Sequence, residues 1–126
     1  MEPKINTVYI TGKDDKIPTL AIRKPKTGEF TIYVHVQYIY FNLTPFVVNI
    51  SVTDQNDKII LQPSGNTFDF SNVKTDGHET GISEVSFYIV IQAAEVADSN
   101  RLTAHVKIGD EEYNVSVFLT GGSNNG

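Results

Sequence analysis

Residues 30–41 read FTIYVHVQYIYF, and the alternation within this stretch sets the interpretation of the whole chain. Every even position carries an apolar or aromatic side chain, whereas the odd positions begin with Thr31, Tyr33, His35 and Gln37. Successive side chains of a strand point to opposite faces, so this pattern predicts a strand with one face in the core. We expect the strand to cover residues 29–41.

The same two-residue period returns in four other stretches, which are residues 46–53, 83–92, 101–108 and 112–119. Shorter runs predict weaker strands at residues 6–10, 19–23, 58–61 and 67–70. All five prolines, Pro63 included, fall between these predicted strands, where a missing N–H does not interrupt a ladder. Helical periodicity is not visible over ten or more residues, and residues 93–100 are expected to form one turn at most.

About seven short strands without crossover helices predict a single all-β domain, an antiparallel sandwich of immunoglobulin-like architecture. In that arrangement residues 6–10 with 19–23 form the first strand, which shares a sheet with residues 29–41 and 83–92. Residues 101–108 lie in the opposite sheet. We expect the domain to span residues 1–119, with a less regular N-terminal edge over residues 1–28. Residues 120–126 have linker composition and are expected to form a flexible tail.

The closing segment alternates Leu102, Ala104, Val106 and Ile108 before a turn at Gly109-Asp110 and a new strand at Tyr113. Together with the strand count and the stretches 30–61 and 85–119, it resembles small uncharacterised bacterial sandwich proteins of the immunoglobulin-like and fibronectin type III-like class. The chain departs from antibody domains in having neither Cys nor Trp. The resemblance covers most of the chain and implies a fold, but no particular function, because such sandwiches host many functions.

The composition is that of an acidic, soluble globular domain, with 15 acidic and 10 basic residues, a net charge of −5 and no cysteine. Nucleic-acid binding is not expected, since it requires a basic stripe. The one basic cluster, Arg23, Lys24 and Lys26, is expected to lie in a solvated loop. We see neither a signal peptide nor a membrane span, and we therefore expect a cytoplasmic location and no membrane partner.

The three histidines are the natural starting point for metal or acid–base chemistry. His35 and His105 are predicted to point outward from opposite sheets, too far apart to share an ion. Asp76, His78 and Glu79 lie close together in one loop and are the metal candidates, but a solvated loop explains them as well. Acidic residues such as Asp54 are explained by turn propensity. We therefore expect no metal, no other cofactor and no enzymatic activity.

Outward-pointing aromatic and apolar residues gather on one predicted face. Tyr33, Ile39 and Phe41 of one strand are expected to adjoin Tyr88 and Val90 of another, and tyrosine is favoured at protein interfaces. Coverage of this face by residues 1–28, or β propensity alone, would also explain them. We expect a non-enzymatic protein-binding or assembly module whose partner is another protein or a second copy of the chain. A small-ligand or carbohydrate-binding sandwich and a phage structural component remain open alternatives.

Overall fold

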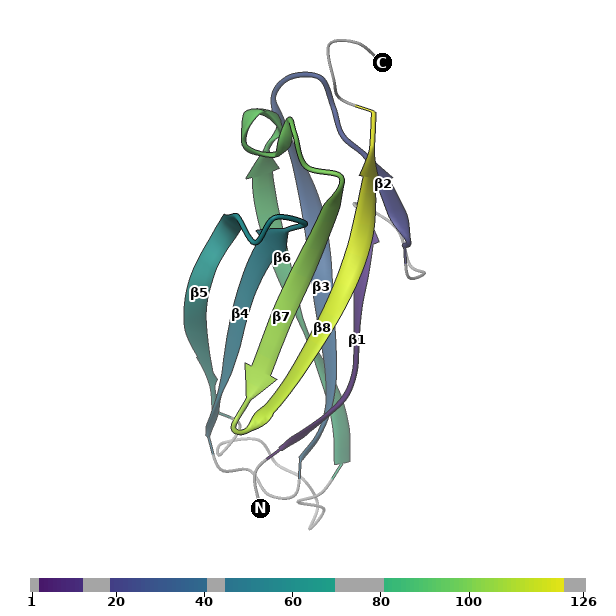
Figure 1. The fold of residues 1–126 in the computed structure, drawn as a ribbon. Helices are drawn as coiled ribbons and strands as arrows, with labels where there is room; N and C mark the ends of the chain where they lie inside the picture. The colour runs from purple at the N-terminus through teal and green to yellow at the C-terminus, as the bar shows by residue number, and fades with distance from the viewer. Residues whose placement is uncertain (1–2, 13–18, 41–44, 70–80, 122–126) are drawn as a thin grey trace.

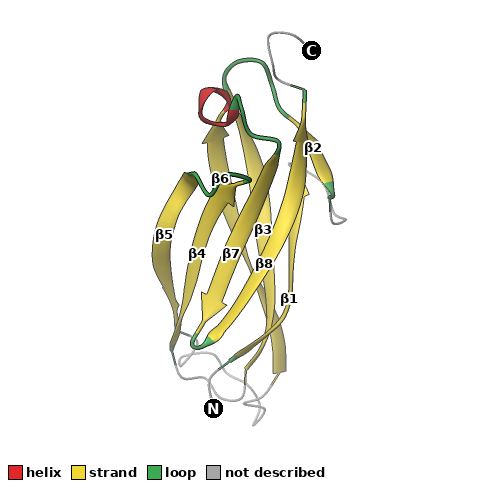
Figure 2. Ribbon diagram, viewed as in Figure 1, coloured by secondary structure: helices red, strands yellow, loops and turns green. Residues whose placement is uncertain are grey.

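The computed structural model describes residues 3–12, 19–40, 45–69 and 81–121, apart from the side chain of Tyr40. Within these ranges the chain forms eight strands and one short 3-10 helix, η1 (Figures 1 and 2). Across the same ranges, no helix has both the length and the apolar character needed to cross a membrane. The elements are β1 (Lys4–Gly12), β2 (Ala21–Arg23), β3 (Glu29–Tyr40), β4 (Phe46–Asp54), β5 (Ile59–Phe68), β6 (Gly81–Gln92), η1 (Ala93–Val96), β7 (Arg101–Ile108) and β8 (Glu111–Thr120).

The strands form two sheets that face each other (Figure 1). The three-stranded sheet has the order β1-β3-β6, and the five-stranded sheet has the order β2-β8-β7-β4-β5. Every pairing is antiparallel except that of β2 with β8. The expectation of an all-β chain with two layers is therefore confirmed.

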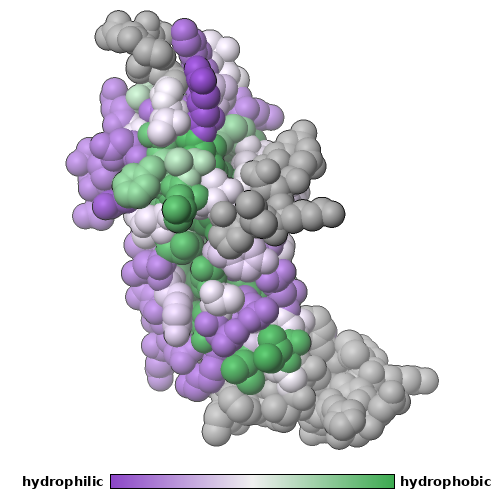
Figure 3. Space-filling model, turned by 90° about the vertical axis from the view of Figure 1, so that its right-hand side faces the viewer, coloured by the Kyte–Doolittle hydropathy of each residue, from purple (hydrophilic) through white to green (hydrophobic). Residues whose placement is uncertain are grey.

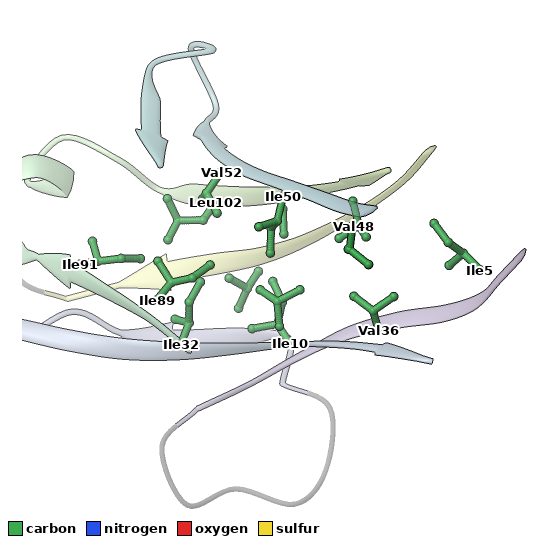
Figure 4. Packing of buried hydrophobic residues seen from close by; sticks show 14 of the residues in the cluster. Ile5, Ile10, Ile32, Val36, Val48, Ile50, Val52, Ile89, Ile91 and Leu102 are labelled. Atoms are coloured by element: carbon green, nitrogen blue, oxygen red, sulfur yellow. The ribbon is translucent and has the colours of Figure 1, made fainter. Parts of the chain in front are cut away.

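The core lies between the two sheets and follows the alternation of the sequence. On β3 the even residues from Ile32 to Tyr38 are fully buried, while the odd residues between them are partly exposed. Ile10, Ile89 and Ile91 extend this layer on the neighbouring strands. They meet inward residues of the five-stranded sheet, among them Val48, Ile50, Val52 and Leu102 (Figure 4). Complete burial of a Val or Ile side chain contributes about 1.5–3 kcal/mol, so this layer is the main source of stability.

The prediction that residues 19–23 continue the first strand in its own sheet is wrong. The N–H of Thr19 still donates to the carbonyl of Ile10 on β1 (2.8 Å), but the carbonyl of Leu20 accepts from the N–H of Phe118 on β8 (2.9 Å). The chain therefore passes from one sheet to the other between Thr19 and Leu20, and β2 becomes a separate strand parallel to β8. The described residues accordingly hold eight strands instead of about seven.

The prediction that Pro63 separates two strands is also wrong. The sequence predicts two short strands at residues 58–61 and 67–70, but β5 is one strand that continues through Pro63. Ile50 pairs with Ser64 and Val52 pairs with Leu61, so two residues of β5, Gln62 and Pro63, oppose one residue of β4. Proline is tolerated there because β5 is an outer strand and the bulge needs no N–H donor at that position.

Lys24 fastens η1 to the end of the sandwich, contrary to the solvated loop expected for the basic cluster. Its side chain is buried. The ammonium group donates hydrogen bonds to the carbonyls of Val96 (3.0 Å), Ala97 (3.2 Å) and Ser99 (2.8 Å). A cation is favourable at this place because the last carbonyls of a helical turn carry partial negative charge.

Asp54 holds the same end of the sandwich from the last position of β4, where the turn to β5 begins. Its carboxylate is buried and accepts hydrogen bonds from the N–H groups of Asn56 (2.8 Å) and Lys58 (3.0 Å) and from the hydroxyl of Ser99 (2.9 Å). Burial alone would raise the pKa of Asp54, but these hydrogen bonds and the nearby Lys58 charge outweigh it and hold the pKa below its ordinary value. Asp54 is thus a structural acceptor as well as a turn residue.

Candidate functional site: the outer face of the three-stranded sheet

The structure brings part of the predicted interface set together. Tyr33 and Tyr88 are direct partners in the β3–β6 register, and Val90 lies two residues further along β6, opposite Thr31. Ile39 lies at the other end of the same face, opposite Ile82. Phe41 lies outside the described residues. The outer face therefore carries two apolar or aromatic groups, one at each end of β6, instead of one continuous cluster.

Polar side chains fill the middle of this face and connect its three strands. The His35 ring on β3 lies between its neighbours, with Nε2 2.8 Å from Thr11 Oγ1 on β1 and Nδ1 2.7 Å from Ser86 Oγ on β6. Its ring also stacks on that of Tyr9, with centroids 4.6 Å apart and planes inclined by 14°. The hydrogen bonds are cross-strand contacts of the kind that stabilises a sheet. They hold the face in one arrangement.

Tyr9 spans the width of the sheet. Its hydroxyl donates a hydrogen bond of 2.8 Å to Oε1 of Glu84, so a side chain of β1 reaches across β3 to β6. The bond to Glu84, together with partial burial and the carboxylate charge, raises the pKa of the Tyr9 phenol. Tyr9 therefore stays protonated and remains a donor, because ionisation would place two negative charges side by side.

Ile82 is a member of this face that the sequence reasoning missed. Its side chain is 62% exposed, compared with 72% for Tyr88 and 48% for Val90. The predicted strand began at residue 83, whereas β6 begins at Gly81. Extending the even-numbered alternation of β6 back by one step would have included Ile82, since it continues the series of outward residues. β6 thus presents three large exposed apolar or aromatic side chains along one face.

The remaining chemical candidates do not gather into a site among the described residues. His105 lies on β7 in the other sheet, where its ring nitrogens are 2.8 Å from Thr53 Oγ1 and 2.8 Å from Asn114 Oδ1. His35 and His105 therefore belong to different sheets, as expected. Groups of three or more potential metal ligands are absent from the part of the chain that the structure describes. Residues 76–79, which hold the predicted metal candidates, lie outside that part.

A cavity of about 250 Å³ lies beside η1, where Asp54, Lys58, Glu95 and Ser99 contribute to its lining. Part of its polar lining is already engaged in hydrogen bonds within the protein. Asp54 accepts from Ser99, and the Lys58 ammonium donates to the carbonyl of Glu95 at 2.7 Å. Pockets for small ligands usually enclose about 300–1,000 Å³ and present free polar groups. The contacts here are those of a packed end of the sandwich.

A second apolar surface follows the side of the molecule on which β1, β2 and β8 lie. The space-filling view of that side shows an apolar stripe between hydrophilic flanks (Figure 3). Leu20, before β2, is 80% exposed, and Phe118 on β8 is 58% exposed. Phe118 points away from the core, so it provides a comparison position for the exposed side chains of β6.

Comparison with known proteins identifies a fold but not a family. The chain matches no protein-family model and no curated protein sequence. Among solved structures it is similar to part of the alkylpurine DNA glycosylase AlkC of Pseudomonas fluorescens, which was solved bound to DNA containing an abasic site analog. The identity is 13% and the TM-score 0.53, over 95% of this chain and 31% of that one.

A second similarity is to a glycosyl hydrolase family 2 member of Bacteroides cellulosilyticus. The identity is 12% and the TM-score 0.53, over 92% of this chain and 15% of that one. This chain thus spans less than a third of either protein, and at such identities the likeness concerns the fold alone. The comparisons define a small all-β domain of two sheets, and neither establishes whether it is an enzyme.

Proposed function

We propose that this chain is a non-enzymatic protein-binding or assembly module that uses the outer face of its three-stranded sheet. The observation that carries the proposal is the exposure of Ile82 (62%), Tyr88 (72%) and Val90 (48%) on a single strand, β6. Exposed apolar residues are ordinary when they are scattered. Three exposed apolar or aromatic residues on one face of an outer strand form a surface from which a bound partner can exclude water.

The surroundings of these residues support the proposal. The central polar groups of the face, His35, Glu84 and Ser86, are held by hydrogen bonds within the sheet. A partner would therefore meet a surface that is already ordered, and binding would cost little side-chain entropy. Tyr88 adds a large rigid ring with a hydroxyl, which suits the centre of an interface.

The arrangement of the histidines supports a structural role rather than a catalytic one. Both ring nitrogens of His35 and both of His105 face hydroxyl or amide groups of neighbouring strands. A general base needs a free nitrogen directed at a substrate proton. The contacts of these two rings instead follow the strand pairing.

An immunoglobulin-like connectivity is part of the same proposal. Its support is the strand order, in which β1, β3 and β6 form one sheet and β8, β7 and β4 lie side by side in the other. This is the distribution expected when the strands are taken in immunoglobulin order. The parallel pairing of β2 with β8 also leaves the first part of the chain divided between the two sheets.

Photo-crosslinking tests the proposed surface. Benzoylphenylalanine in place of Tyr88 is expected to form a covalent adduct with one defined protein, in cells that contain the natural partners. The same group in place of Phe118, which is 58% exposed on the other sheet, is the matched control. An adduct from position 88 and not from position 118 supports the proposal. Equal labelling at both positions, or no adduct at position 88, contradicts it.

A further inference from the structure

Of the four outer strands among the described residues, three carry features that hinder pairing with another chain. β1 has a bulge between Ile5 and Thr7, and β2 contains only three residues. β5 contains Pro63 and two irregularities in its register with β4. Bulges, short strands and prolines are the means by which sheets protect their outer strands from unwanted association.

β6 has none of these features. Its 12 residues, Gly81–Gln92, pair with β3 without a break, from Gly81 opposite Tyr40 to Gln92 opposite Glu29. It contains no proline and no lysine, and Glu84 is its only charged residue. A regular strand of this length presents about 40 Å of unpaired backbone. Within the described residues, no strand pairs with its outer side.

We propose that the partner of this strand is β6 of a second copy of the chain, paired antiparallel around a two-fold axis at Ser86. The proposal rests on the proposed function and names its partner. Such pairing would join the two three-stranded sheets into one six-stranded sheet. An interface around a two-fold axis uses the same patch on both copies, so the strand must be complementary to itself.

The side chains of β6 satisfy this requirement on the outer face. With the axis at Ser86, Ile82 of one copy lies opposite Val90 of the other, and Glu84 lies opposite Tyr88. Each of these contacts occurs twice. The first joins two exposed apolar side chains, and the second places a phenol hydroxyl beside a carboxylate that already accepts from Tyr9. Directly opposed pairs of these types stabilise antiparallel sheets.

The inner face is complementary in the same register. Val85 lies opposite Phe87 of the second copy, and both side chains are only partly buried in the single chain. Further along β6, Ile89 and Ile91 are already buried. The middle of β6 is therefore the place where a second copy would remove the most apolar surface from water.

Two other registers illustrate the cost of losing these contacts. Moving the axis to Phe87 places the Glu84 carboxylate opposite Val90. Moving it to Glu84 places two carboxylates opposite each other, which is destabilising. The axis at Ser86 keeps the two Glu84 side chains apart, and it pairs apolar with apolar residues at both ends.

Charge exchange at Ile82 and Val90 tests the pairing, and both positions are exposed enough to accept polar side chains. Wild-type protein should sediment as a concentration-dependent dimer. Ile82→Lys or Val90→Glu alone should weaken dimerisation about tenfold or more, because each places a charge opposite an apolar residue twice per dimer. An equimolar mixture of the two variants should dimerise again, since the introduced lysine then opposes the introduced glutamate at one end and Val90 opposes Ile82 at the other.

Disulfide formation tests the register independently, because the chain has no cysteine of its own. Ile82→Cys mixed with Val90→Cys should form a mixed disulfide under mild oxidation. Neither variant alone should do so, because like positions then lie about 27 Å apart along the strand, far beyond the reach of a disulfide. Circular dichroism melting of each variant verifies that it is folded.

Two results would overturn the inference: a wild-type chain that stays monomeric up to about 1 mM, or a dimer that neither Ile82→Lys nor Val90→Glu weakens. These outcomes can be told apart from failure of the proposed function. If benzoylphenylalanine at position 88 labels a different protein while the chain itself stays monomeric, protein binding stands and self-pairing is wrong. If it labels nothing, both proposals are wrong.

Discussion

Replacement of Asp54 by alanine should destabilise the protein strongly although Asp54 lies at the very end of β4, beside a turn. The change removes one acceptor from each of three donors, which are the N–H groups of Asn56 and Lys58 and the hydroxyl of Ser99. Hydrogen bonds to a charged group contribute about 1.5–3 kcal/mol each, and water can reach part of this site after truncation. We therefore expect Asp54→Ala to lower the free energy of unfolding by about 3 kcal/mol.

Urea unfolding followed by circular dichroism measures this loss. Asp98→Ala is the matched control, since Asp98 is an exposed acidic residue beside the same cavity. It should change the free energy of unfolding by no more than about 0.5 kcal/mol. An Asp54→Ala protein within about 1 kcal/mol of wild type would refute the structural role assigned to this carboxylate.

The same site predicts a dependence on pH. The pKa of Asp54 is lower in the folded protein than its ordinary value of 3.8. Its contribution to stability is therefore complete above the unfolded pKa and is lost as the pH falls through the folded pKa. Asp54→Asn, which cannot titrate, should show a smaller loss of stability between neutral and acidic pH. An unchanged acid dependence in Asp54→Asn would contradict this assignment.

Two further predictions concern Lys24 and Tyr9. Lys24→Met should lower the free energy of unfolding by about 2–4 kcal/mol in urea, because three carbonyls lose their donor. The exposed Lys26→Met is the control, and equal effects of the two changes would count against the buried ammonium. Tyr9→Phe should cost about 0.5–1 kcal/mol at neutral pH. Because the pKa of Tyr9 is raised above 10.0, its contribution should persist below pH 10.0 and disappear as the pH rises through the folded pKa. An advantage of wild type over Tyr9→Phe that did not shrink at alkaline pH would be inconsistent with the bond to Glu84.

Much of the fold could be predicted because alternation reports burial directly. The strand predicted at residues 29–41 is β3 (Glu29–Tyr40), and residues 101–108 are β7 with the same bounds. The wrong predictions concern elements whose structure depends on contacts between distant parts of the chain. The three residues of β2 are too few to show a period, and their partner, β8, lies almost a hundred residues away. From the sequence alone, Pro63 indicates the end of a strand. A proline is tolerated within β5 only because β5 is an outer strand, and that position depends on the strand pairing.

The surface could be predicted only in part for a related reason. Alternation placed Tyr33 and Tyr88 on the outer face, and the structure pairs them. It could not show that Ile39 lies at the far end of that face, since distance along a sheet depends on register. The sequence around Lys24 is typical of a solvated loop, and the sequence around Asp54 is typical of a turn. Both side chains contact Ser99, in the segment that follows η1, and no local pattern reveals these contacts.

Amide hydrogen exchange along β6 tests most directly whether this strand is the contact surface for assembly. Half of its backbone N–H groups pair with β3, and the alternate ones face away from it. In concentrated protein we expect these outward amides between Ile82 and Val90 to become protected, while those of β5 and β8 stay as they are in dilute protein. Protection that appears on β5 or β8 instead, or outward β6 amides that exchange equally fast at every concentration, would contradict the account.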